Sequence, residues 1–195
     1  SSDFGKQAGM PSHPALLDWL ALEFVKSGYS MKYMHCLMVT SDAYRMKSDI
    51  TPAFAASQKI DPNNIFLWHF RLQRLGAEPI WDTIHLAAGS LDLKIGGRSF
   101  TPDSDDSSQR RGVYITRGFA TNRDVTPQFL QTFDVDDGRV PCPIRTQTVT
   151  APQSLFLMNS PEVESASARL ASRVRKETAN DLKQAIELTY RLTVA

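Results

Sequence analysis

The sequence predicts a mainly α-helical, multi-helix domain with one long irregular loop. Three observations support this fold class. Apolar residues recur at helical spacing through most of the N-terminal half and again in the C-terminal quarter. Residues 94–112 (KIGGRSFTPDSDDSSQRRG) are instead rich in glycine, proline and polar residues, as is typical of a loop. A β pattern is confined to residues 113–116 (VYIT), so at most a short β element is expected there.

The first two predicted helices lie near the N-terminus. Ser12 is expected to cap the first helix, whose apolar face carries Leu16, Leu17, Leu20 and Phe24. Gly28 is expected to end this helix, and Ser30 is expected to cap the next one. The second helix is predicted to turn four apolar side chains toward a core, namely Met31, Met34, Leu37 and Met38. A methionine stripe of this kind is more typical of packing than of a cofactor site.

Two further helices are predicted in the middle of the chain. Asp61 followed by Pro62 is typical of a helix start, because aspartate accepts from a free backbone N–H and proline has none to lose. The helix that would follow contains Ile65, Phe66, Trp68, His69 and Leu72. The next helix runs from about residue 77 to residue 88, with Pro79 in its first turn and Gly89 at its end.

The C-terminal part is predicted to return to helix. Residues 127–133 fit one or two helical turns. Ser160 and Pro161 open a helix with an inward face of Val163, Ala166, Leu170 and Val174. Asn180 or Asp181 opens the last helix. A chain of this length is expected to form a single domain over residues 1–195.

Composition excludes several classes of function. The net charge of +1 lacks the basic excess of a generic nucleic-acid-binding protein, so no nucleic-acid partner is expected. The sequence has no apolar run of the ~18 residues that a membrane span requires, and no signal peptide. A CxxCH motif is absent, so no c-type haem is expected on this chain. The disulfide state of Cys36 and Cys142 stays open, because the two lie far apart in sequence.

The strongest candidates for chemistry are Glu78, Asp82 and His85. Spacings of four and three residues place all three on one face of the predicted helix. Two carboxylates and an imidazole have the donor types for a divalent metal, and two close carboxylates raise each other's pKa as an acid–base pair requires. The alternative is that the carboxylates pair with arginines such as Arg71 or Arg74 and hold helices together. No HExxH motif completes a metal site, so no metal is predicted.

Weaker candidates for binding are Trp81, Arg71, Arg74 and His13. Trp81 lies beside the acidic stripe and is either a sugar platform or a core residue. His13 is either a ligand or a structural residue at the start of the first helix. The segment DVDDG at residues 134–138 contains the acids of a calcium loop, but its glycine comes one place early, so an acidic turn is favoured.

Several long strings, in order along the chain, resemble a planctomycete-specific C-terminal domain of unknown function. They are SDFGKQAGMPSHPALLDWLALEFVKSGYSMKYMHCLMVTSDAYR (2–45), DPNNIFLW (61–68), GGRSF (96–100), RRGVYI (110–115), FDVDD (133–137) followed by Cys142, and APQSLFLMNSP (151–161). The resemblance implies a family domain that starts upstream of residue 1. It also implies a place in large exported proteins, in the periplasm or cell envelope. Glu78 and Asp82 match the family pattern, whereas His85 does not.

The resemblance brings no settled activity with it. Many family members carry a planctomycete cytochrome-c-like domain upstream, so a c-type haem is expected there. The favoured hypothesis is a binding or scaffolding module whose partners are upstream domains of the same protein, or a polysaccharide. The alternative is part of an enzyme that acts on envelope or algal polysaccharide, coupled to electron transfer. Glu78, Asp82 and His85 would then be the catalytic residues.

Overall fold

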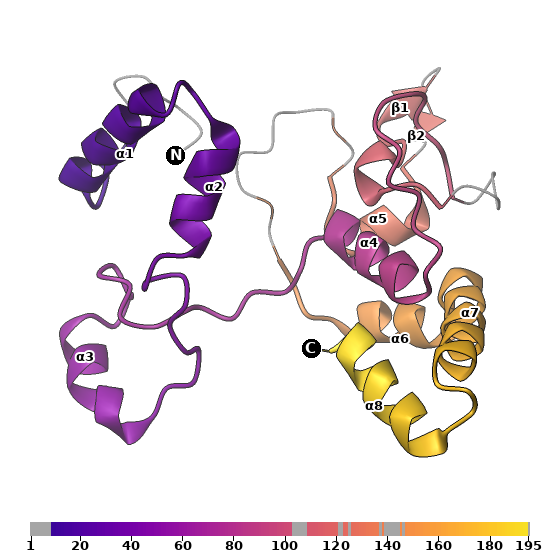
Figure 1. The fold of residues 1–195 in the computed structure, drawn as a ribbon. Coiled ribbons are helices and arrows are strands. Elements are labelled where there is room, and N and C mark those ends of the chain that lie inside the picture. The colour runs from indigo at the N-terminus through magenta and orange to yellow at the C-terminus, as the bar shows by residue number, and fades with distance from the viewer. Residues whose placement is uncertain are drawn as a thin grey trace. The chain divides into compact units, whose positions relative to one another are not determined.

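The computed structural model describes residues 9–102, 109–120, 123–124, 126–136, 138, 145 and 147–194. Within these ranges the chain forms eight α-helices, two short 3-10 helices and one pair of two-residue strands, which confirms the predicted mainly helical class. The chain divides into two compact units, Ser1–Gln73 and Arg74–Ala195, and each is described by itself (Figure 1). The expectation of a single domain over 1–195 stays a prediction.

The first unit contains two α-helices that pack on each other, α1 (Pro14–Lys26) and α2 (Met31–Val39), followed by η1 (Pro52–Phe54) and α3 (Ala55–Ile60). Gly28 follows α1 with a φ of 67°, and the Ser30 hydroxyl accepts a hydrogen bond from the backbone N–H of Tyr33 at 3.2 Å, as predicted. Met34 is the one apolar side chain that is buried among the described residues of this unit. The prediction that Met31 and Met38 face a core is wrong, because they are 58% and 44% exposed.

Residues 61–72 do not form the predicted helix. Asp61 instead ends α3, and its carboxylate accepts a hydrogen bond from the backbone N–H of Phe66 at 2.7 Å. The Asn64 amide bonds both backbone groups of His69, at 2.8 and 3.3 Å, which closes a compact loop. Asn64 and Leu67 have φ values of 53° and 54°, in the left-handed region. Side-chain bonds to the local backbone have therefore replaced the helical ladder.

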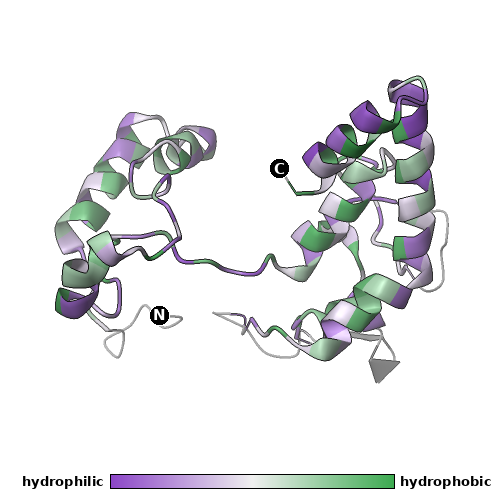
Figure 2. Ribbon diagram, turned by 90° about the horizontal axis from the view of Figure 1, so that it is seen from below, coloured by the Kyte–Doolittle hydropathy of each residue, from purple (hydrophilic) through white to green (hydrophobic). Residues whose placement is uncertain are grey.

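The second unit is built around α4 (Ala77–Ala87), which contacts α5, α7, α8 and η2. The other elements are η2 (Gly112–Tyr114), β1 (Phe119–Ala120), β2 (Arg123–Asp124), α5 (Gln128–Thr132), α6 (Ala151–Asn159), α7 (Pro161–Glu177) and α8 (Leu182–Thr193). The buried core consists of Ala77, Trp81, Phe100, Ile115, Phe129, Leu130, Phe133 and Val135. Figure 2 shows hydrophobic and hydrophilic residues alternating along the helices, as expected where each helix turns one face to a core.

Residues 113–116 carry a single β-bridge, within the predicted limit of at most a short β element. Residues 112–114 form η2, and Ile115 makes a single parallel bridge with Phe100. The short strands β1 and β2 pair antiparallel a few residues later. In the predicted loop at 94–112, the described residues before η2 form no helix or regular strand, and residues 103–108 lie outside the described part.

The predicted helix boundaries in the second unit are confirmed. Pro79 lies in the first turn of α4, and Gly89 follows that helix with a φ of 71°. The Ser160 hydroxyl accepts from the N–H of Val163 at 3.3 Å to cap α7. The Asp181 carboxylate accepts from the N–H of Gln184 at 3.0 Å to cap α8. Ala166 and Val174 are buried on the inward face of α7, as predicted.

Candidate functional site

Glu78 lies in the first turn of α4 and forms an ion pair. Its Oε2 atom is 2.7 Å from Nη1 of Arg145. Burial by itself would raise the pKa of this carboxyl, but the hydrogen bond and charge of Arg145 outweigh it and lower the pKa. Glu78 is therefore ionised at neutral pH and holds the side chain of Arg145 on α4.

Asp82, one turn further along α4, fixes a second segment. Its Oδ1 atom accepts from the backbone N–H of Gly112 at 2.5 Å, and its Oδ2 atom is 3.0 Å from Nε of Arg111. These contacts attach the start of η2 to the helix. The arginine pairing expected as the alternative to chemistry is therefore present at both carboxylates, but the partners are Arg145 and Arg111 rather than Arg71 or Arg74.

His85 completes the predicted stripe but is buried, with 6% of its surface exposed. Its ring lies 4.4 Å from the ring of Trp81, and Nδ1 is 3.2 Å from the hydroxyl oxygen of Ser90. The Nε2 atom has no hydrogen-bond partner among the described residues. Burial, assisted by the charge of Arg169, lowers the pKa of His85 against the opposing charges of Asp82 and Glu162, so the imidazole is neutral at pH 7.

The stripe therefore lacks the geometry for metal binding. Within the described part of the chain, no three histidine, cysteine, aspartate or glutamate side chains are grouped so that they could hold a metal ion. Cys36 is exposed and free, and Cys142 lies outside the described residues.

Trp81 is a core residue. Only 4% of its surface is exposed, and its ring packs against Phe129 with a centroid distance of 5.5 Å. The indole Nε1–H donates to the backbone carbonyl of Arg110 at 2.9 Å. A sugar platform needs an exposed ring face, so this geometry favours the core interpretation.

Arg74 belongs to a polar network at the end of α5. Its Nη2 atom is 2.5 Å from Oδ2 of Asp134, which also accepts from the backbone N–H of Thr148 at 2.8 Å. Nε of Arg74 donates to the Thr148 carbonyl at 2.8 Å. Asp136 accepts from the N–H of Gly138 at 2.8 Å. In the DVDDG segment, of which residue 137 lies outside the described part, the carboxylate of Asp134 is thus occupied by an arginine and a threonine.

Arg71 and His13 belong to the first unit and have local contacts. Arg71 donates to the backbone carbonyl of Asn63. His13 is itself the residue before α1, so the expectation that Ser12 would cap this helix is wrong, and no side chain caps it. Ser12 Oγ is 2.9 Å from Nδ1 of His13, and the His13 ring meets the Phe66 ring edge-on at 6.2 Å. The observed contacts of Arg71 and His13 are therefore with neighbouring protein groups.

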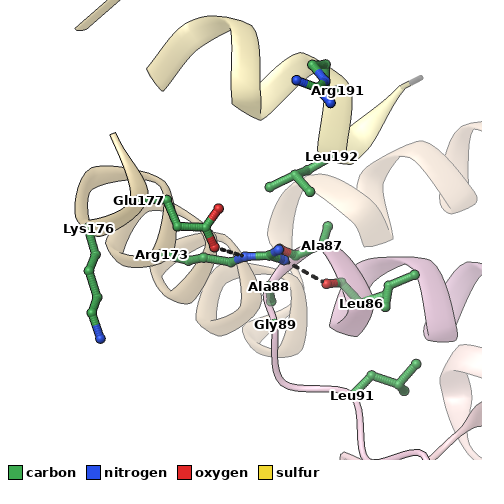
Figure 3. A pocket seen from close by; sticks show the side chains of 10 residues that line it. All are labelled: Leu86, Ala87, Ala88, Gly89, Leu91, Arg173, Lys176, Glu177, Arg191 and Leu192. Carbon is green, nitrogen blue, oxygen red and sulfur yellow. Dashed lines mark hydrogen bonds and ion pairs between the residues drawn. The ribbon is translucent and has the colours of Figure 1, made fainter. Parts of the chain in front are cut away.

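A pocket that the sequence did not predict lies where α4, α7 and α8 end (Figure 3). Its lining combines apolar and charged side chains: Leu86, Ala87, Ala88, Gly89, Leu91, Arg173, Lys176, Glu177, Arg191 and Leu192. The basic last turn of α7 and the stop at Gly89 were visible in the sequence. That these ends meet is a tertiary property.

The chain thus forms a mainly helical domain. Within it, Glu78 and Asp82, the strongest candidates for chemistry, hold other parts of the second unit on α4. Over residues 1–195 the chain matches PSD1, described as a protein of unknown function (DUF1553), and it belongs to this family. No curated protein and no solved structure matches the chain. The resemblance to a domain of unknown function is therefore confirmed, while the planctomycete restriction, the exported setting and the cytochrome-c association stay predictions. Among the described helices, none is long and apolar enough to cross a bilayer.

Proposed function

We propose that this domain is a binding or scaffolding module of an exported multidomain bacterial protein, and that helix α1 docks onto an upstream domain of that protein. The single observation behind this proposal is that α1 buries none of its side chains. Its 13 residues include five large apolar side chains that are 45–59% exposed: Leu16, Leu17, Trp19, Leu22 and Val25.

The five exposed side chains do not form a single stripe. At about 100° per residue, their positions distribute them around most of the helix circumference. Asp18, Glu23 and Lys26 are the charged residues of α1, and Glu23 is paired with Lys26 at 2.8 Å. Helix α2 packs on one side of α1 and leaves these apolar side chains exposed. Large apolar side chains that stay exposed on several sides of a helix are typical of an interaction surface, so a partner with an apolar surface fits α1.

The enzyme alternative has no comparable support. Glu78 and Asp82 are engaged in ion pairs, and His85 is buried and neutral. A catalytic role would require each of them to reach a substrate. The alternative therefore stays a prediction that no arrangement of the described residues favours.

The proposal is tested by retention of the separately produced upstream domains on the immobilised chain. Leu17→Glu and Leu22→Glu should weaken retention at least about tenfold, because a charge would enter an apolar interface. Leu93→Glu is the matched control, since Leu93 is 63% exposed and lies in the second unit. A polysaccharide array run in parallel tests the other predicted partner. No retention of the upstream domains, or equal loss with the control variant, would contradict the proposal.

A further inference from the structure

We propose that the pocket at the ends of α4, α7 and α8 binds an acidic peptide segment that carries an apolar side chain. This site is separate from α1, so it stands or falls independently of the proposed function. Figure 3 shows the lining residues on three helix ends, with Leu192 between α8 and the end of α4 and the side chain of Lys176 on the outer side of α7.

The charged lining has an excess of cations. Arg173, Lys176 and Arg191 are positive, and Glu177 is the single acid. The whole chain has 22 basic and 21 acidic residues, so this excess is a local feature. Glu177 does not neutralise the pocket as a whole, because its carboxylate is 2.8 Å from Nε of Arg173 and pairs with that side chain.

The guanidinium of Arg173 bonds the backbone at the end of α4. Its Nη1 atom donates to the carbonyls of Leu86 and Ala87 at 3.1 and 2.9 Å, which satisfies the open C-terminal end of α4. Gly89 allows this approach, since a Cβ atom there would lie 3.2 Å from Cδ of Arg173. The guanidinium of Arg173 is therefore occupied by protein groups.

The charged groups of Lys176 and Arg191 differ from that of Arg173. Neither forms an ion pair or side-chain hydrogen bond with any described residue. Basic side chains near helix C-termini interact favourably with the helix dipole, but that interaction leaves their donor groups available. Lys176 and Arg191 come from different helices and lie on different sides of the pocket, as Figure 3 shows.

The apolar walls determine what else the ligand should carry. Leu86 is 60% exposed although it lies in the last turn of α4, and Leu91 and Leu192 are partly exposed. A peptide with two carboxylates and an apolar side chain would pair with both cations and cover this surface. Arginine and carboxylate groups form bidentate pairs, which favours a carboxylate partner at Arg191. An inorganic anion would leave the leucines exposed.

The test uses a fluorescein-labelled peptide, Glu-Leu-Glu-Glu-Leu-Glu, and fluorescence anisotropy with the full chain. Lys176→Gln and Arg191→Gln should each weaken binding about threefold, and the double variant about tenfold, because each exposed ion pair contributes modestly. Leu86→Ala should weaken it by a similar factor, and a Ser-Leu-Ser-Ser-Leu-Ser peptide should not bind. Lys183→Gln removes an exposed cation of α8 that does not line the pocket, so it is the matched control and should bind as wild type.

Several outcomes would overturn the proposal. They are absence of saturable binding, equal weakening by Lys183→Gln, or unchanged binding after Leu86→Ala. Displacement of the peptide by a sulfated oligosaccharide at a lower concentration than by unlabelled peptide would also overturn it, because the pocket would then select a glycan. Far-UV circular dichroism of each variant confirms that the helices are intact.

Discussion

Replacement of Gly112 by alanine is the sharpest test of how η2 is attached to α4. Gly112 is buried at the start of η2, and its N–H donates to Asp82. An alanine Cβ at this position would lie 2.7 Å from the carbonyl oxygen of Glu78 and 2.8 Å from its Cα. Both atoms belong to the backbone of α4, so no flexible side chain can move aside to relieve the contact. Either η2 or the first turn of α4 must shift.

The expected size of the effect follows from two opposing terms. The closest contact is roughly 0.7 Å shorter than ordinary van der Waals distance, and overpacking of this kind costs about 1–3 kcal/mol. A glycine-to-alanine change also restricts the unfolded chain, which stabilises by about 0.4–1 kcal/mol. The shift would additionally lengthen the bond between Gly112 and Asp82. A net loss of about 1–2 kcal/mol in the free energy of unfolding is expected.

Amide hydrogen exchange followed by mass spectrometry is the appropriate assay, because it reports on each unit separately. Peptides from α4 should exchange about 5- to 30-fold faster in Gly112→Ala, and peptides from α1 should not change. Gly9→Ala is the control, since no atom lies within 4 Å of a Cβ at that position. Unchanged or slower exchange in α4 would refute the close approach of η2 to the helix backbone.

Three further predictions concern the second unit. Asp134→Asn should lower the free energy of unfolding at pH 7, measured with urea, by about 2 kcal/mol, because it removes the carboxylate that pairs with Arg74 and accepts a hydrogen bond from Thr148. Burial would raise the pKa of Asp134, but hydrogen bonds from Thr148 and Arg74 outweigh it and lower the pKa. The carboxylate therefore stabilises the fold fully near neutral pH, and this stabilisation is lost as the pH falls through the folded-state pKa. Asp134→Asn should not show this loss. His85 has a lowered pKa, so the unfolded state binds its proton first and wild-type stability should fall as pH drops below about 6.5. His85→Phe should abolish this decline between about pH 7.5 and 5.5, and a parallel decline in the variant would assign it to other groups. Gly89→Ala should lower the free energy of unfolding by about 1 kcal/mol, since Gly89 has a φ of 71° and Arg173 lies against it; an unchanged thermal midpoint would contradict this.

Local signals in the sequence predicted several helix boundaries correctly, although α3 and α6 were not predicted. Ser30, Ser160 and Asp181 each cap the helix that follows, because a cap depends on a side-chain oxygen and an N–H three residues away. Gly89 ends α4 because glycine adopts positive φ at little cost. The same reasoning failed at residues 61–72, where Asp61 bonds the N–H of Phe66 five residues later instead of capping a new helix.

The candidate site shows the limit of local reasoning. The spacing of Glu78, Asp82 and His85 correctly predicted that they lie on one helix. It could not predict which side chains and backbone groups would contact them. Arg145 lies 67 residues from Glu78, and Gly112 lies 30 residues from Asp82. Those contacts give both carboxylates structural partners, and their catalytic role stays a prediction.

The helical class, several helix ends and the membership of a family of unknown function could be predicted from the sequence, because these depend on periodicity, short-range bonds and long ordered strings. The tertiary structure was needed to show that η2 packs against the α4 backbone, that His85 is buried with no partner for Nε2 among the described residues, and that three helix ends form a pocket. The reason is physical. A helix is stabilised by contacts three and four residues apart, whereas the environment of a charge is set by groups that folding brings from distant positions.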